Sequence, residues 1–190
     1  GNEWILSDNG LGMLTAGQTT PTSYFVDAAE REKKGGQAFY SCLEYNSEIY
    51  FGSDNGRVWC YQKENGQFQL QNLPASSRIV SINSVEGNEL IFTTAKDGFF
   101  SYQPKTKAIE HFPASRFPYA SIHSVYVDKA SEVWFEQHIP GTVVHFNPRT
   151  RILKQEKVPV EPTSTDRSRP AFHIHEDING VLWVHPYGGD

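Results

Sequence analysis

Short apolar runs that alternate with polar residues follow one another along the chain, separated by turn-forming pairs such as Asn-Gly and Asp-Gly. This alternation, together with a scarcity of helix-forming stretches, predicts many short β-strands. Only residues 27–34 have a helical composition, and we expect one or two turns of surface helix there. The pattern therefore predicts an all-β fold.

A bulky residue at the centre of an apolar run recurs about every 45 residues. A glycine follows each of these anchors after six or seven residues, twice within the turn sequence Ser-Asp-Asn-Gly, where Asn and Gly tolerate positive φ. This period is typical of the four-stranded blades of a β-propeller, whereas a β-sandwich would not repeat in this way. The five anchors are Trp4, Tyr50, Ile91, Trp134 and Trp183.

Each complete repeat predicts four antiparallel strands, A to D, with the anchor on strand B. The first repeat begins at its strand B and the last ends after its strand B, so we interpret the chain as an arc of about four blades from a larger propeller. We expect one propeller region, with partial blades at 1–37 and 171–190 and whole blades at about 38–70, 79–112 and 122–156.

The charge balance argues against two classes of partner. The chain has 17 Lys+Arg and 22 Asp+Glu, a formal net charge of −5, with no block of one sign, so we expect neither nucleic acid nor an anionic membrane surface as a partner. The apolar runs are too short to span a bilayer, and the first residues do not resemble a signal peptide. Because there is no initiator Met, we interpret the chain as an internal piece or a processed form.

The last repeat resembles a known family. The stretch 174–189, IHEDINGVLWVHPYGG, is similar to the two-component regulator propeller repeat, which reads roughly I-x-E-D-x-x-G-x-L-W-I-G-T-x-x-G-G. Residues 125–135 form a weaker copy, although Glu136 and His185 stand where the family usually has small residues. The resemblance implies the periplasmic sensor region of a hybrid two-component sensor histidine kinase of gut Bacteroidetes, which senses an oligosaccharide released from a polysaccharide.

The loops supply the candidate ligand-binding residues. In propellers the D–A and B–C loops share one face around the central channel, and small ligands often bind there. Aromatic and basic side chains suit a sugar through stacking and hydrogen bonds, although such loop residues are also often merely solvated. The predicted ligand-binding residues are Arg116, Tyr119, His138, Arg167, Arg169, His185 and Tyr187.

Three histidines near the C-terminus have the residue type of a metal site. If residues 177–180 form the hairpin turn, Phe172 pairs with His185, and His173 and His175 lie on the opposite face of the sheet. A shift of one residue in register would reverse this conclusion. We therefore expect no metal and no cofactor, and interpret these side chains as packing or hydrogen-bonding histidines.

Two pairs of residues are expected in the core. Cys42 is predicted on strand A and Cys60 on strand C of one blade, about 9.5 Å apart, which exceeds the limit of about 7 Å between the Cα atoms of a disulfide. We therefore expect two free, largely buried thiols. The anchors Trp134 and Trp183 are expected to pack between blades.

The recurring acidic residues have a turn explanation. Asp54 and Asp97 recur in B–C turns, and Asp128 and Asp177 in A–B turns, where Asp caps its own turn without any catalytic role. No catalytic residues are assigned, and we expect a non-enzymatic sensor fragment. Two alternatives stay open: a protein-interaction or dimerisation scaffold that binds a second copy or a neighbouring propeller, and, less favoured, a propeller glycosidase or lyase.

Overall fold

A computed structural model of the chain describes residues 2–25, 38–118, 121–137, 139, 141–159 and 171–186. In this part, every regular element is a β-strand except η1 (Ala114–Arg116), a single 3-10 turn. The all-β prediction is confirmed, while the helix expected at 27–34 lies outside the described residues. No helix in these ranges has the length and apolar character that crossing a bilayer requires.

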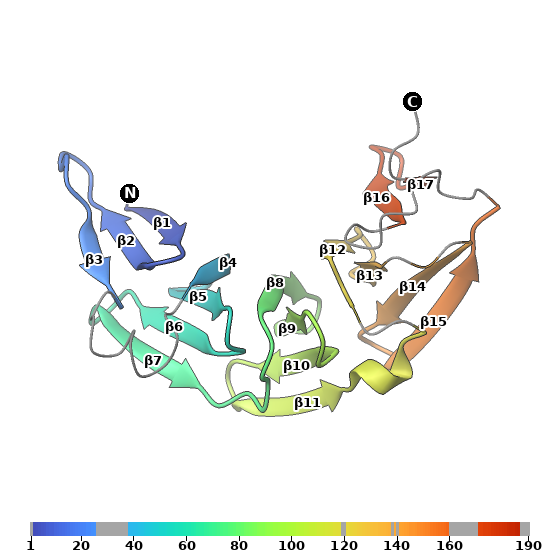
Figure 1. The fold of residues 1–190 in the computed structure, drawn as a ribbon, viewed down its shortest axis with the longest axis horizontal. Coiled ribbons are helices and arrows are strands. Elements are labelled where there is room, and N and C mark those ends of the chain that lie inside the picture. Colours follow the sequence, from blue (N-terminus) through green and yellow to red (C-terminus); the bar gives the residue numbers. More distant parts are fainter. Residues whose placement is uncertain are drawn as a thin grey trace. The chain divides into compact units, whose positions relative to one another are not determined.

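The contacts between residues divide the chain into two compact units, Gly1–Ile82 and Asn83–Asp190. The first unit contains a three-stranded sheet and a four-stranded sheet, both antiparallel, in which each strand pairs with the next along the chain (Figure 1). The strands are β1 (Glu3–Ser7), β2 (Gly10–Leu14) and β3 (Thr22–Tyr24), then β4 (Phe39–Tyr45), β5 (Glu48–Ser53), β6 (Val58–Gln62) and β7 (Gln67–Gln71).

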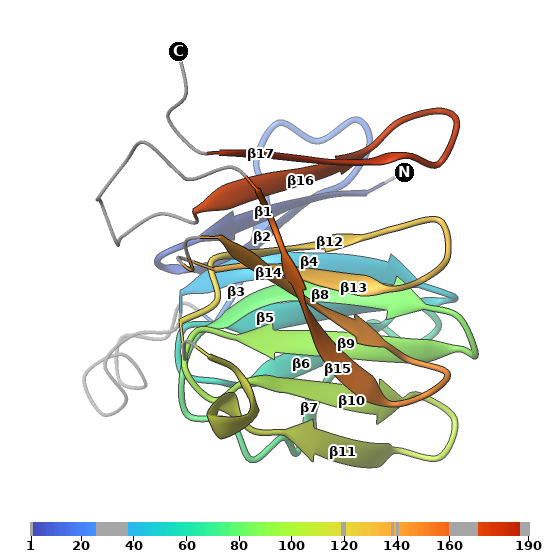
Figure 2. The same cartoon turned by 90° about the vertical axis from the view of Figure 1, so that its right-hand side faces the viewer.

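The second unit repeats the same antiparallel order, and its last two strands form one hairpin (Figure 2). The strand β8 (Ile79–Val85) spans the boundary between the units. The sheets are β8 with β9 (Glu89–Thr94), β10 (Phe99–Gln103) and β11 (Ala108–Phe112); β12 (Ser124–Val127), β13 (Val133–Glu136), β14 (Thr142–Asn147) and β15 (Ile152–Lys157); and β16 (Phe172–Glu176) with β17 (Leu182–Pro186). The predicted strand order A to D is confirmed, and the assignment of all repeats to one region stays a prediction.

Aromatic side chains fill the space between sheets within each unit. In the first unit, Trp4 packs with its ring centroid 4.8 Å from that of Phe51 and 4.9 Å from that of Tyr61. In the second, Phe99 stacks on Phe112 at 4.5 Å within a cluster that includes residues of two neighbouring sheets. A single blade leaves both of its faces apolar, so this burial between neighbouring sheets supplies most of the stabilisation.

The repeated glycine after each anchor has a double reason. Gly56 and Gly98 lie in B–C turns with φ of +79° and +88°, a conformation that glycine adopts without strain. A Cβ atom at Gly98 would lie 2.1 Å from the carbonyl oxygen of Phe112, and one at Gly56 would lie 2.6 Å from that of Ala75. The turn therefore needs glycine for two reasons: its backbone angles, and the close approach of the chain that leaves strand D, which leaves no room for a Cβ atom.

The acidic residues of two A–B turns bind the anchors. Asp128 accepts the indole N–H of Trp134 at 2.8 Å and the backbone N–H of Glu132 at 2.8 Å. Asp177 likewise accepts the indole N–H of Trp183 at 3.1 Å, in addition to backbone N–H groups of its own turn. The turn-capping interpretation is confirmed for these two residues, and the same carboxylate also fixes the tryptophan six residues later. In the B–C turn at Asp54, by contrast, the Ser53 hydroxyl accepts the backbone N–H of Arg57. Trp183 is nevertheless 58% exposed, so its predicted place in the core is wrong for the described residues.

The register of the last hairpin differs from the prediction by one residue. Phe172 pairs with Pro186, and His173 lies directly opposite His185. The reason is the loop, which has five residues between Glu176 and Leu182 and is closed by the Asp177 N–H bond to the Val181 carbonyl at 3.0 Å. The extra loop residue puts His173 and His185 on the same face of the sheet, contrary to the prediction.

The two cysteines form no disulfide, as predicted. Cys42 pairs with Phe51 across the sheet and Cys60 pairs with Tyr50, so the two side chains point to opposite faces. Cys60 is buried, but Cys42 is exposed, which contradicts the prediction that both thiols are largely buried. Cys42 lies on β4, the edge strand of its sheet, and an edge strand has a neighbour on one side only.

Candidate functional site

The structure describes two of the seven predicted ligand-binding residues. Arg116 ends η1, and its guanidinium lies 5.1 Å from the centre of the Phe112 ring. His185 is exposed on β17. The binding role of these side chains stays a prediction. The other five, Tyr119, His138, Arg167, Arg169 and Tyr187, lie outside the described residues.

His185, one of the predicted ligand-binding residues, belongs to a group of four polar residues that we call the loop-end cluster. Its members are Ser124, Glu136, His173 and His185. Ser124 pairs with Glu136 between β12 and β13, and His173 pairs with His185 between β16 and β17. Both pairs occupy the strand ends that lead into D–A and B–C loops. The cluster therefore lies at the end of the strands where a ligand was expected.

Glu136 is the centre of this cluster. Its carboxylate is buried, accepts a hydrogen bond from the Ser124 hydroxyl, and accepts the backbone N–H of Ile174 at 2.9 Å. The oxygen that accepts from Ser124, Oε2, also lies 3.5 Å from Nδ1 of His173, whose ring centre is 5.4 Å from that of His185. One carboxylate thus links the β12–β13 pair to the first strand of the following sheet.

The equivalent position in the sheet β4–β7 shows why the repeat usually has a small residue here. That position is Gly52, which pairs with Ser41 as Glu136 pairs with Ser124. A Cβ atom on Gly52 would lie 2.4 Å from the Ser41 hydroxyl and 2.6 Å from the Cβ of Ile79. In the sheet β12–β15, by contrast, the Glu136 carboxylate occupies the junction with β16, the first strand of the following sheet. The departure of Glu136 and His185 from the family pattern was the sequence signal for this cluster.

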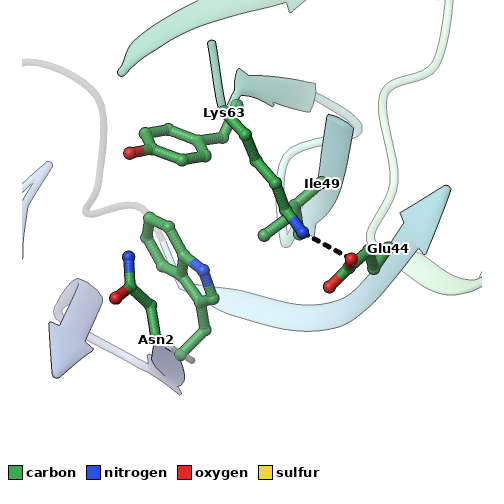
Figure 3. Close-up of a pocket in the computed structure, with 6 residues that line it drawn as sticks. Asn2, Glu44, Ile49 and Lys63 are labelled. Atoms are coloured by element: carbon green, nitrogen blue, oxygen red, sulfur yellow. Dashed lines mark hydrogen bonds and ion pairs between the residues drawn. The ribbon is translucent and has the colours of Figure 1, made fainter. Parts of the chain in front are cut away.

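A second candidate site is a cavity of about 460 Å³ in the first unit, which we call the Trp4 cavity (Figure 3). In Figure 3, Asn2 lies across the opening from Lys63 and Glu44, whose ion pair is drawn as a dashed line. These residues belong to the strand ends that carry A–B and C–D turns, the opposite ends to those predicted for a ligand. The lining residues are Asn2, Trp4, Glu44, Ile49, Tyr61 and Lys63.

Sequence reasoning missed the Trp4 cavity for an identifiable reason. Trp4 was identified only as a blade anchor, and Tyr61 lies on β6 in the neighbouring sheet. Glu44 and Lys63 come from two different strands or turns, and no local spacing connects them. The Lys63 ammonium and the Glu44 carboxylate form an ion pair across the sheet. The Lys63 side chain is 39% exposed and the Glu44 side chain 62% exposed. Such an exposed pair contributes only about 0–1 kcal/mol to stability.

Comparison with known proteins gives the fold. No family model and no curated protein matches the chain. Among solved structures, the extracellular domain described as that of the hybrid two component system BT3049 from B. thetaiotaomicron aligns over 100% of this chain and 26% of its own, with a TM-score of 0.72 and 16% identity. Virginiamycin B lyase from Staphylococcus aureus aligns over 100% of this chain and 68% of its own, with a TM-score of 0.69 and 16% identity.

A third similar structure, YCF48 bound to D1 peptide, aligns over 99% of this chain and 58% of its own, with a TM-score of 0.66 and 14% identity. The chain thus spans about a quarter of the length of the BT3049 domain, which agrees with the predicted portion of a larger propeller. At these identities the likeness concerns the fold alone. The chain has a β-propeller-type fold, shared with extracellular domains of hybrid two-component systems, as its repeat indicated.

Proposed function

We propose that this chain is a non-enzymatic part of the extracellular or periplasmic sensor region of a hybrid two-component regulator, and that it contributes to recognition of a polysaccharide-derived oligosaccharide. Two observations support the sensor assignment: the two-component regulator propeller repeat in the sequence and the fold likeness to the BT3049 extracellular domain. Ligand recognition rests on the loop-end cluster.

The observation that carries the proposal is the placement of Glu136 and His185 at a repeat position that is usually small. A carboxylate accepts hydrogen bonds from sugar hydroxyls, and an imidazole both donates and accepts them. Glu136 is held by the N–H of Ile174, and His173 and His185 are both accessible, with the His173 side chain 38% exposed. A cluster fixed in this way loses little entropy when a ligand binds.

The same geometry supports a route for the signal. Glu136 joins the β12–β13 pair to β16 through its bond to Ile174, and His173 on β16 touches the same carboxylate. A ligand that hydrogen bonds to Glu136 or His173 competes with these bonds. It would therefore bind one arrangement of the neighbouring strands better than another and shift the balance between them.

Calorimetry with a panel of neutral and acidic oligosaccharides tests this proposal, on this chain and on the complete ectodomain. We expect one class of oligosaccharide to bind, and His185→Ala to weaken that binding about tenfold, the equivalent of about 1.4 kcal/mol. His175→Ala is the matched control, because His175 is also exposed but lies two residues farther along β16, opposite Trp183 and nearer the A–B turn. Uniform absence of binding to the complete ectodomain would exclude oligosaccharide recognition.

Two alternative functions have an observation in their favour. The likeness to virginiamycin B lyase favours a catalytic propeller, and the likeness to YCF48 bound to D1 peptide favours a protein-interaction scaffold. Product formation on incubation with the same oligosaccharides would support an enzyme. Sedimentation of the chain and of the ectodomain would detect self-association, which the scaffold alternative expects and the sensor proposal does not require.

A further inference from the structure

The Trp4 cavity has the size and the mixed lining of a small-ligand site. Its volume of about 460 Å³ lies in the range of about 300–1,000 Å³ usual for such sites. One part of its lining is apolar, from Trp4, Ile49 and Tyr61, and the rest is polar, from Asn2, Glu44 and Lys63. A ligand that fits must therefore present both apolar faces and hydrogen-bonding groups.

The aromatic part of the lining is rigid. Trp4 lies in contact with Phe51 and Tyr61, at 4.8 Å and 4.9 Å between ring centres, and meets Phe68 edge-on at 6.1 Å. Packed in this way, the indole keeps one orientation whether or not a ligand is present. Aromatic side chains with a fixed orientation bind C–H faces of a ligand at small entropic cost.

The charges of the lining select a neutral ligand. Glu44 and Lys63 form an ion pair, so the two charges of the cavity cancel. A ligand with one negative charge would face the Glu44 carboxylate, and a ligand with one positive charge would face the Lys63 ammonium. Either would be repelled by one member of the pair, whereas a neutral ligand leaves the two charges compensated.

The hydrogen-bonding groups fit adjacent hydroxyls. The ion pair places an acceptor and a donor side by side, and each keeps further capacity: the carboxylate has spare lone pairs and the ammonium has spare N–H groups. A vicinal diol presents a donor and an acceptor on adjacent carbon atoms, so it can hydrogen bond to both members of the pair. The Asn2 amide donates to the Met13 sulfur at 3.3 Å, a weak acceptor that a hydroxyl oxygen would replace.

We propose that the Trp4 cavity binds a single neutral pyranose unit, with one sugar face against Trp4 and a vicinal diol on the Glu44–Lys63 pair. This site lies at the strand ends that carry A–B and C–D turns, so it is distinct from the loop-end cluster. The Trp4 site does not depend on the oligosaccharide that we propose to bind at the loop-end cluster.

Protein-observed NMR on the whole chain tests the site, with methyl β-glucopyranoside, methyl β-galactopyranoside and methyl α-mannopyranoside as neutral probes. We expect at least one of them to shift the indole N–H signal of Trp4 saturably, with a dissociation constant in the millimolar range, about −4 kcal/mol. Glucuronate and protonated glucosamine, which carry opposite charges, are expected to bind about tenfold more weakly.

Charge variants sharpen the test. Glu44→Gln leaves Lys63 unpaired, so it should weaken glucoside binding about fivefold and reverse the preference toward glucuronate. Lys63→Gln should do the opposite and favour glucosamine. The matched control is Glu86→Gln, which removes the carboxylate of another exposed ion pair, with Arg149, and should change no affinity. The His185→Ala variant of the loop-end cluster should also leave this binding unchanged.

Three results would overturn the proposal: no shift of the Trp4 signal with any neutral probe, equal affinity for neutral and charged sugars, or affinities that Glu44→Gln and Lys63→Gln leave unaltered. Loss of binding in Glu44→Gln together with loss of the dispersed spectrum would report unfolding instead, and Lys63→Gln then decides. Binding that responds to His185→Ala and not to the cavity variants would assign the sugar to the loop-end cluster alone.

Discussion

The loop-end cluster and the Trp4 cavity both contain a glutamate beside a basic side chain, but the two glutamates have different partners. Glu136 is buried and bonded to a backbone N–H of the neighbouring strand, whereas Glu44 is exposed and bonded mainly to one flexible lysine. A buried carboxylate with fixed partners stabilises the junction between sheets, while an exposed pair contributes little to stability. Burial and partners, rather than residue type, therefore decide how much such a group contributes to stability.

The largest expected effect comes from Glu136→Ala. The substitution leaves the Ile174 N–H and the Ser124 hydroxyl without their carboxylate at a buried position, so we expect a loss of about 3 kcal/mol in the free energy of unfolding. Urea denaturation followed by tryptophan fluorescence measures it. The matched substitution Glu44→Ala in the Trp4 cavity should cost less than about 1 kcal/mol. Equal losses in the two variants would contradict the contrast between the two glutamates.

An intermediate effect is expected at the equivalent small position, Gly52. A Cβ atom there would lie 2.4 Å from the Ser41 hydroxyl and 2.6 Å from Ile79, so Gly52→Ala should lower the free energy of unfolding by about 2 kcal/mol. Gly12→Ala is the control, because a Cβ on Gly12 meets its nearest atom at an ordinary 3.4 Å. If both variants are equally stable in urea, the junction beside Gly52 accommodates a side chain, and the contrast between Gly52 and Glu136 is contradicted.

The smallest effect is expected at Asp177, which caps the hairpin of the loop-end histidines. The indole N–H of Trp183, followed by the backbone N–H groups of the turn, lowers the pKa of Asp177 below its usual value of 3.8. Because the folded-state pKa is lowered, the contribution to stability is complete above pH 3.8 and is lost as the pH falls through the lower folded value.

An NMR titration of the Trp183 indole N–H checks this expectation. The signal should move toward that of a solvent-exposed indole only below the ordinary carboxyl range, and Asp177→Ala should show the moved position at every pH. The indole of Trp59, which lies in the other unit, is the internal reference. A midpoint above 3.8 would mean that the bond to Trp183 does not form in solution.

Local sequence patterns predicted a large part of this molecule. Alternating apolar residues predicted the strands, because a strand packs through one face and successive side chains point to opposite faces. The sequence of a few neighbouring residues therefore shows this alternation. The repeated glycines and the Asp128 and Asp177 turns were predictable for the same reason: a turn is decided within four or five residues. The repeat, finally, predicted the propeller blades that the solved structures match.

What the sequence predicted less well depends on small differences between nearly equal alternatives. One extra loop residue before Leu182 moved His173 to the same face as His185, because side chains alternate at every residue of a strand. Exposure of Cys42 depends on its edge strand, and exposure of Trp183 depends on what surrounds its hairpin. Neither exposure can be predicted from the residues that neighbour Cys42 or Trp183 in the sequence.

The sequence by itself determined the all-β class, the order of strands in each blade and the turns between them, since these follow from periodicity and from the backbone freedom of glycine and the capping oxygens of aspartate. Only the tertiary structure decided which polar residues meet. Glu136 reaches Ile174 across 38 residues, and Lys63 reaches Glu44 across 19, through packing of separate strands that no local pattern encodes. Both candidate sites arise from such contacts, because a binding site needs groups from several strands held at fixed distances.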